Sequence, residues 1–341
     1  MPLESSAPVR RGTTFLFALV GLLLACLAAG VSSGALHVGF LDAMSGRLSP
    51  AAAAVLWQVR LPRVLLAAVL GGALAVAGVV FQALLRNPLA DPYVLGVSGG
   101  ASLGGVIALL LGLGRAPGAL GELGLAGAAF CGALFALVVI ERVATVDGHL
   151  AVYTLLLSGA IFNAFSGALI FFLQSVASLE QLHSMVFYLM GQVPSLALSR
   201  VGALAGAVAA VVVLLWRMAR DFNVLSLGEE TAAELGVDTE RLKRRAFLLG
   251  SLLTALAVSV SGLIGFVGLI VPHALRLVLG ADHRRLVPGA FLGGASLLVL
   301  ADLLARTVAL PSELPVGVVT ALVGGPFFLY LLRSRGRAWR G

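Results

Sequence analysis

Few residues of this chain have side chains that could carry out chemistry, and they do not form a catalytic pattern. The 341 residues include 16 Asp plus Glu, five His and two Cys, and the one lysine is Lys243. No Gly-x-x-x-x-Gly-Lys-Ser/Thr phosphate loop occurs, so this chain has no such loop with which to hydrolyse ATP. The histidines are scattered without the spacing of metal ligands. We therefore expect no catalytic residue, no metal site and no cofactor.

Asp302 is the main carboxylate that falls inside a long apolar segment. An ionisable group at membrane depth is by default a functional candidate. Arg306 follows four residues later, so an i,i+4 ion pair within one helix explains the carboxylate equally well. The sequence leaves both interpretations open.

The longest polar stretch, residues 221–247, has the pattern of two short helices. Glu229 and Glu230 suit the positive N-terminal end of a helix over the segment GEETAAELG, and Gly236 suits its C-cap. Asp238 suits the N-cap of the second helix. Such a pair of helices between two apolar segments is either a solvated loop or a compact element that docks a soluble partner.

The composition indicates that these polar residues are positioned by long apolar segments. Hydrophobic residues make up 60% of the chain, charged residues 11%, and the mean hydropathy is +1.04. These values are typical of an integral membrane protein. The basic residues lie between apolar runs and do not form a block, so we expect them to set the topology and expect no nucleic-acid partner. Both cysteines lie in apolar runs, which is typical of buried thiols.

Polar interruptions and Pro or Gly residues divide the chain into apolar spans. The ten expected spans cover residues 14–34, 62–85, 93–112, 119–140, 151–174, 197–217, 244–265, 268–280, 287–307 and 316–333. The eighth is short for a full crossing. Between the fifth and sixth, we expect a short interfacial helix that ends at Gly191.

The basic residues also predict the orientation of the chain. If residues 1–13 form a cytoplasmic tail and the first apolar run is a retained helix, most of the 23 Lys and Arg residues fall on the inner side. We therefore expect an even number of crossings, with both termini in the cytoplasm.

A weak internal repeat accompanies this topology. The tetrapeptide ALAV occurs at 73–76 and again at 255–258, and a proline follows each copy, Pro88 and Pro272. One copy lies in a span running inward and the other in a span running outward, so the repeat is inverted. Paired, proline-interrupted segments of this kind indicate a transporter whose pathway lies at the repeat interface.

Four segments together carry a family resemblance. They are LPRVLLAAVLGGALAVAGVVFQALLRNPLADPYVLGVSGGASLG (61–104), LGEETAAELGV (227–237), SGLIGFVGLIVPH (261–273) and ELPVGVVTALVGGPFFLYLL (313–332). They resemble the permease subunits of ABC importers for iron–siderophore complexes, haem and cobalamin, in the same order along essentially the whole chain after residue 14. The resemblance implies an all-α polytopic membrane protein with about ten transmembrane helices and an inverted repeat, the BtuC-like fold, as one permease domain over residues 1–341.

The same resemblance implies the partners. In this family two permease copies, by default a homodimer, sit in the bacterial inner membrane above two cytoplasmic ATP-binding subunits, and a periplasmic substrate-binding protein delivers the ligand. ATP hydrolysis then belongs to the partners, so this chain itself is not an enzyme. Haem, ferric siderophore and cobalamin all remain open as substrate.

The resemblance also assigns roles to residues. Asn87, Pro88 and Leu89 form a tight inner-face turn that matches the cytoplasmic end of the translocation path. The loop 219–243 matches the coupling helices that contact the ATPase, and the residues expected there are Glu229, Glu230, Ala232, Leu235 and Gly236. Arginines that match those presented to acidic residues of the binding protein are Arg60, Arg63 and Arg306. Arg60 and Arg63 flank Pro62 at the start of a span, where we expect a cation to be exposed.

Three glycines follow the inner-face turn at intervals of four residues. Gly96, Gly100 and Gly104 fall on one face of the next helix. Small residues at this spacing allow another backbone to approach closely, so we expect a packing role for them.

Two other functions stay open from the residues alone. A secondary transporter driven by an ion gradient would use intramembrane carboxylates or histidines, and Asp302 is nearly the only candidate. A membrane scaffold or assembly factor would need neither a cavity nor an ATPase partner.

Overall fold

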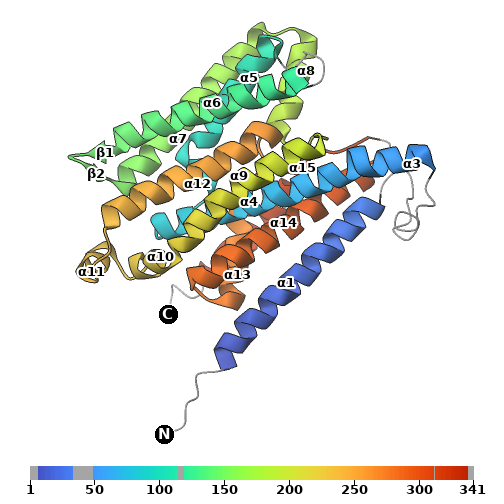
Figure 1. Ribbon diagram of the computed structural model, residues 1–341. Helices are drawn as coiled ribbons and strands as arrows, with labels where there is room; N and C mark the ends of the chain where they lie inside the picture. The colour runs from blue at the N-terminus through green and yellow to red at the C-terminus, as the bar shows by residue number, and fades with distance from the viewer. Residues whose placement is uncertain (1–6, 34–48, 114–118, 311, 337–341) are drawn as a thin grey trace.

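The computed structural model describes residues 7–33, 49–113, 119–310 and 312–336, and these are almost entirely helical. Figure 1 shows long helices lying side by side along one common direction, with short elements at the ends of the bundle. The strands among the described residues are β1 (Thr145–Val146) and β2 (His149–Leu150), which form an antiparallel hairpin. Helix α1 begins at Ala7, so the described part of the expected tail 1–13 is helical.

The helices of the first part of the chain are α1 (Ala7–Ser32), α3 (Pro50–Ala54), a π-helical stretch (Val55–Arg60), α4 (Leu61–Leu84), a 3-10 turn (Pro92–Leu95), α5 (Val97–Leu110), α6 (Ala119–Ala144), α7 (Val152–Val176) and α8 (Leu179–Met190). Those of the second part are α9 (Leu198–Arg217), α10 (Ala219–Leu225), α11 (Glu229–Glu234), α12 (Thr239–Ser261), α13 (Val267–Leu279), α14 (His283–Thr307) and α15 (Val316–Gly336).

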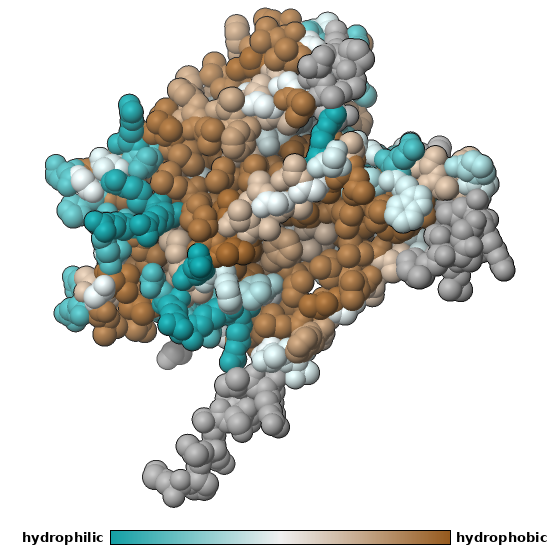
Figure 2. Space-filling model, in the orientation of Figure 1, coloured by the Kyte–Doolittle hydropathy of each residue, from teal (hydrophilic) through white to brown (hydrophobic). Residues whose placement is uncertain are grey.

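The ten expected spans correspond to ten apolar helical segments. Seven are long and apolar enough to cross a membrane, and they lie in α1, α3 to α4, α6, α7, α9, α12 and α14. Three shorter apolar helices, α5, α13 and most of α15, complete the set. Figure 2 shows a broad hydrophobic band over these helices, with hydrophilic residues gathered near α10, α11 and the hairpin. The all-α polytopic fold is therefore confirmed.

Helix α4 lies at the centre of the bundle. Every residue from 70 to 84 is buried, and α9, α12, α13 and α14 all contact this helix. Glycines make these contacts close: a Cβ atom on Gly71 would collide with the backbone of Gly294 in α14, and one on Gly78 with the backbone of Gly268 in α13. Because lipid gives helices no hydrophobic reason to associate, close backbone packing of this kind is what holds them together.

The two halves of the chain repeat the same sequence of elements. The long helix α4 is followed by the short α5 and then by the long α6 and α7, and the long α12 is followed by the short α13 and then by α14 and α15. Each short helix begins after a left-handed residue, Gly96 (φ 85°, ψ −17°) and Phe266 (φ 69°, ψ −22°). The two ALAV segments lie on α4 and α12, which pack against each other. This arrangement agrees with the inverted repeat expected from the sequence.

Two expectations from the sequence are corrected by the structure. The third span was expected to run continuously over 93–112, but a 3-10 turn ends at Leu95 and α5 begins only at Val97. The left-handed conformation of Gly96 separates the two, since a right-handed helix cannot pass through a residue with positive φ. Cys26 is buried as expected, whereas Cys131 is exposed on α6.

The central glycine contacts lead to a stability prediction. Gly78→Ala should lower the free energy of unfolding by about 1–3 kcal/mol, because the added methyl group meets the backbone of α13. Gly206→Ala on the exposed side of α9 is the matched control, since a Cβ atom there meets nothing within 4 Å. Thermal unfolding of the purified chain in mild detergent measures both. Equal unfolding midpoints for the two variants would contradict the packing role of Gly78.

Candidate functional site

The bundle has two polar ends, which we name after the short helix that each carries. At the α8 end, the Ser178 hydroxyl accepts a hydrogen bond from the Gln181 N–H and so starts α8, and the Gln181 amide donates to the Leu110 carbonyl of α5 (2.8 Å). At the α11 end lie α10, α11, the β hairpin and the turn between α4 and α5. The predicted site residues divide between these two ends.

An ion network occupies the α8 end. Asp302 of α14 is fully buried, and its two oxygens accept hydrogen bonds from Nε of Arg63 and Nε of Arg306, each at 2.9 Å. Arg63 also pairs with Glu313, with 2.7 Å between Nη1 and Oε2. The i,i+4 pair expected between Asp302 and Arg306 is therefore present, and an arginine of α4 completes it.

The arginines of this network also hold the end of α1. Arg306 donates to the carbonyl of Gly30 (3.1 Å), and Arg60 donates to those of Val31 (3.3 Å) and Ser32 (3.4 Å). The last carbonyls of a helix have no partner within the helix and carry partial negative charge, so cations stabilise them. The network thus connects α1, α4 and α14.

The expected exposure of Arg60 and Arg63 is wrong. Only 6% of Arg60 and 7% of Arg306 are exposed, and the side chain of Arg63 is 14% exposed. The tertiary fold brings Asp302 and the carbonyls at the end of α1 to them, which the sequence spacing does not reveal. Their role in docking a binding protein stays a prediction, and it lacks the exposed cations on which it was based.

The predicted inner-face turn is present at the α11 end. The Asn87 side-chain oxygen accepts from the Leu89 N–H (3.0 Å), and the Asn87 carbonyl accepts from the Ala90 N–H (3.0 Å). Pro88 lies inside the turn that these two hydrogen bonds close, and it is half-buried. Arg86, which precedes the turn, has a left-handed backbone (φ 47°), a conformation that is costly for a residue with a side chain. These contacts make the turn a fixed corner.

Asp91 starts the 3-10 turn that follows. Its carboxylate accepts a hydrogen bond from the Tyr93 N–H at 2.8 Å. Burial raises the pKa of the Asp91 carboxyl, and the hydrogen bond from Tyr93 opposes this shift.

Tyr93, which the sequence pattern did not single out, joins the two halves of the repeat. Its hydroxyl donates to the Ile264 carbonyl (2.8 Å) and accepts from the Ile264 N–H (3.0 Å). The Tyr93 carbonyl accepts from the Asn163 side chain of α7 at 2.8 Å. The break before α5 is therefore bonded to the break before α13. The sequence signal for this contact is Asn163, a polar residue inside an apolar span, because such a side chain needs a hydrogen-bond partner on a neighbouring helix.

The three predicted packing glycines do not all act in the same way. A Cβ atom on Gly100 would collide with the backbone of Gly132, and one on Gly104 with that of Ala128, both in α6. Gly96 precedes α5 and does not belong to its face. Glycine is required there both by the left-handed backbone and by the close approach of Ile140 in α6 and Gly159 in α7. That these three glycines matter for helix packing in the working transporter stays a prediction.

The predicted coupling residues lie on two sides of α11. Ala232 is fully buried and so cannot contact a partner, and Glu229 pairs with Lys243 of α12 (3.1 Å). Glu230 and Leu235 are exposed, the latter by 63% of its surface, and Gly236 follows the helix with φ 85°. Of the expected set, Glu230, Leu235 and Gly236 are exposed and the Glu229 side chain is 34% exposed, so Ala232 alone is out of reach of a soluble partner.

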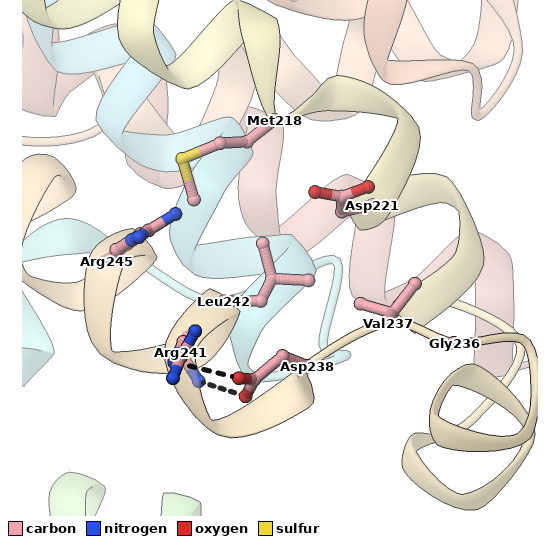
Figure 3. Close-up of a pocket in the computed structure, with 8 residues that line it drawn as sticks. All are labelled: Met218, Asp221, Gly236, Val237, Asp238, Arg241, Leu242 and Arg245. Atoms are coloured by element: carbon pink, nitrogen blue, oxygen red, sulfur yellow. Dashed lines mark hydrogen bonds and ion pairs between the residues drawn. The ribbon is translucent and has the colours of Figure 1, made fainter.

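A polar cavity of about 240 Å³ lies beside α11, between α10 and the start of α12. Figure 3 shows its lining, with Asp221 on one side and the ion pair of Asp238 and Arg241 (2.9 Å) on the other. The Asp238 carboxylate also accepts the Arg241 N–H, which confirms Asp238 as the N-cap of α12. The described residues contain no group of three His, Cys, Asp or Glu side chains that could hold a metal ion.

Helix α10 is fixed to α14 independently of α11. The Asn223 amide donates to the Asp282 carboxylate (2.7 Å), and the Asn223 oxygen accepts from the His283 N–H (2.9 Å). Although burial opposes the shift, hydrogen bonds from Asn223 and from the Arg284 N–H lower the pKa of Asp282, which lies at the N-cap of α14. The end of α10 thus stays with the bundle.

Comparison with known proteins identifies the family to which this geometry belongs. The FecCD transport family matches residues 19–334. The chain belongs to the FecCD transport family.

Two relatives and one solved structure support this assignment over nearly the full length. The cobalamin import system permease protein BtuC of Halobacterium salinarum is 43% identical over 312 residues, covering 91% of this chain and 81% of that protein. The hemin transport system permease protein HmuU of Yersinia pestis is 42% identical over 318 residues, covering 92% and 94%. A metal-chelate type ABC transporter solved in an inward-facing conformation has a TM-score of 0.85 at 31% identity, covering 94% of this chain and 99% of that one.

Membership of the FecCD family makes this chain a multi-pass membrane permease of the ABC type. A transport permease does not transform its substrate, which agrees with the expectation from the sequence that the chain carries no catalytic set.

The buried ion network of this FecCD permease leads to a second stability prediction. Asp302→Asn should lower the free energy of unfolding by about 3–5 kcal/mol, because it leaves the buried Arg306 and the mostly covered Arg63 without their shared carboxylate. Glu313→Gln, which changes the half-exposed partner of Arg63, should cost less than about 1 kcal/mol. Thermal unfolding in detergent compares them, and a loss for Asp302→Asn no larger than that for Glu313→Gln would refute the structural role of the network.

Proposed function

We propose that this chain is the membrane-spanning subunit of an ATP-driven importer that moves a bulky iron chelate, haem or cobalamin across the bacterial inner membrane. The observation that carries the proposal is the match to the FecCD transport family over residues 19–334. The named relatives transport cobalamin and hemin, and the similar solved structure is of the metal-chelate type. The substrate belongs to this class of large, metal-containing ligands.

The partners follow from the same assignment. Two copies of the permease form the pathway, two ATP-binding subunits supply hydrolysis, and a periplasmic protein delivers the ligand. The α11 end faces the cytoplasm and the α8 end faces the periplasm, which agrees with the excess of basic residues near α10, α11 and α12. Helix α1 then begins in the cytoplasm and α15 returns toward it.

Helix α11 is the element that contacts the ATP-binding subunit. Its outer side presents the Glu230 carboxylate and the apolar side chain of Leu235, and Leu227 just before the helix is 65% exposed. Exposed leucines beside a carboxylate on a polar cytoplasmic surface suit insertion into a partner cleft, since burying them removes apolar surface from water. Ala232 instead packs α11 onto its own chain.

The turn of Asn87, Pro88 and Leu89 narrows the cytoplasmic end of the path. It lies close to α11, because Arg86 beside the turn lines one cavity with Leu227, Glu229 and Glu230. A displacement of α11 therefore occurs next to the turn.

No observation favours an ion-gradient-driven transporter. Asp302, the main intramembrane carboxylate that such a transporter could use, already accepts hydrogen bonds from Arg63 and Arg306 and is fully buried.

Co-purification tests the proposed function. The tagged chain, solubilised gently from its native membrane, should bring with it an ATP-binding subunit in about equal amount, and a periplasmic binding protein should stimulate the ATP hydrolysis of this complex. The ligand of that binding protein then identifies the substrate. A chain that purifies alone, without ATP hydrolysis in several mild detergents, would refute the proposal.

A charge reversal on α11 tests its contact with the partner. Glu230→Arg should reduce uptake about tenfold or more, in the range of a coupling energy of about 1–3 kcal/mol, while the chain still inserts into the membrane. Asp221→Arg makes the same reversal on an exposed residue of α10 and is the control, with uptake near that of the wild type. Radiolabelled ligand uptake and membrane content measure both, and wild-type uptake by Glu230→Arg would exclude the contact.

A further inference from the structure

Lys243, the one lysine of the chain, is a buried cation held by two carboxylates. Its Nζ lies 3.1 Å from Oε2 of Glu229 in α11 and 2.5 Å from Oε1 of Glu240 in α12. Only 5% of the Lys243 side chain is exposed. Such pairs are costly to separate, because removal of one member leaves a buried charge without compensation.

This lysine is the polar connection between α11 and the rest of the chain. Among the described residues, the side chains of α11 make no other hydrogen bond or ion pair with another helix. Glycines with positive φ flank the helix on both sides, Gly228 (φ 125°) and Gly236 (φ 85°). The backbone at either end of α11 is therefore of the kind that bends most easily.

Glu240 extends the connection to a second part of the bundle. Its other oxygen, Oε2, accepts the Leu150 N–H at 2.8 Å, and its Oε1 lies 3.7 Å from Nδ1 of His149. Both partners belong to β2, the strand that leads from α6 into α7. A chain of contacts thus runs from α11 through Lys243 to α12 and on to the hairpin between α6 and α7.

The preceding helix does not share this connection. Asn223 of α10 is bonded to Asp282 and His283 at the start of α14. Polar side-chain contacts therefore connect α11 to α12 and the hairpin, whereas those of α10 go to α14.

We propose that Lys243 is a positioning residue that carries a displacement of α11 into α12 and the α6–α7 hairpin. This inference rests on the proposed function, in which the ATP-binding subunit moves α11. A lysine suits the role, since its ammonium group has three donors and can hold Glu229 and Glu240 together. Because separating the charges is costly, α11 and the first turns of α12 move as one unit.

The test uses the complete complex in proteoliposomes, with the ATP-binding subunits and the binding protein. The readout is the ratio of ATP hydrolysis stimulated by the ligand-loaded binding protein to basal hydrolysis. Lys243→Met keeps the apolar stem without the charge and should lower this ratio about tenfold, and Lys243→Arg should restore most of it. Arg217→Met is the matched control, because Arg217 is an exposed cation at the end of α9, outside the loop 219–243 that is expected to contact the ATPase.

A cross-link separates mechanical coupling from simple stabilisation. The double variant Glu229→Cys with Lys243→Cys should lose the stimulation, and a short, cleavable thiol cross-linker between the two cysteines should restore it. Restoration is expected only if the link between α11 and α12 is what matters. This arm also decides the question if Lys243→Met does not insert into the membrane.

The outcomes distinguish this inference from the proposed function. A wild-type chain that assembles with no ATP-binding subunit contradicts the proposed function itself. A wild-type complex with normal stimulation, in which Lys243→Met keeps the ratio within about twofold, overturns the role of Lys243 alone. That role is likewise overturned if cross-linking leaves the stimulation of the uncoupled double variant unchanged.

Discussion

The structure depends on the close backbone contacts of α4. In a membrane the surrounding lipid is as apolar as the helices, so burial of apolar side chains does not by itself bring helices together. Glycines on α4 allow α13 and α14 to approach until backbone touches backbone. The helix buried in this way then fixes the positions of both its ends. One carries the arginines of the ion network, and the other carries the turn of Asn87, Pro88 and Leu89.

The two ends of the bundle use charge in different ways. At the α8 end, Asp302 is fixed between two arginines that also hold α1, so three helices are joined at one point. At the α11 end, Lys243 of α12 pairs with Glu229 of α11, a short helix that has a glycine with positive φ near each end. A network that locks three helices at the α8 end and a single cation that connects a small helix at the α11 end suit the proposed importer, in which the α11 end faces the ATP-binding subunits.

Much of this could be predicted from the sequence. Long apolar runs cross the membrane because unpaired backbone groups are intolerable in lipid, so the ten helices and the short helix α8 followed from hydropathy and from proline and glycine positions. Local signals also gave the N-cap at Asp238, because a capping side chain bonds to a backbone only three residues away. The family resemblance rested on four sequence segments in the family's order along the chain, and the comparison with known proteins confirmed it.

The tertiary structure alone decided which polar groups meet. Arg60 and Arg63 look available in the sequence, yet Arg60 is buried and the Arg63 side chain is 14% exposed, because the end of α1 and Asp302 come to them from distant segments. The bond of Tyr93 to Ile264 and the contacts of Lys243 likewise join residues that the sequence does not pair. Helices and caps are set by neighbours along the chain, whereas the partner of a buried charge is set by how whole helices pack. The sequence by itself therefore determined the membrane fold, and only the packing decided which of its charges face a partner.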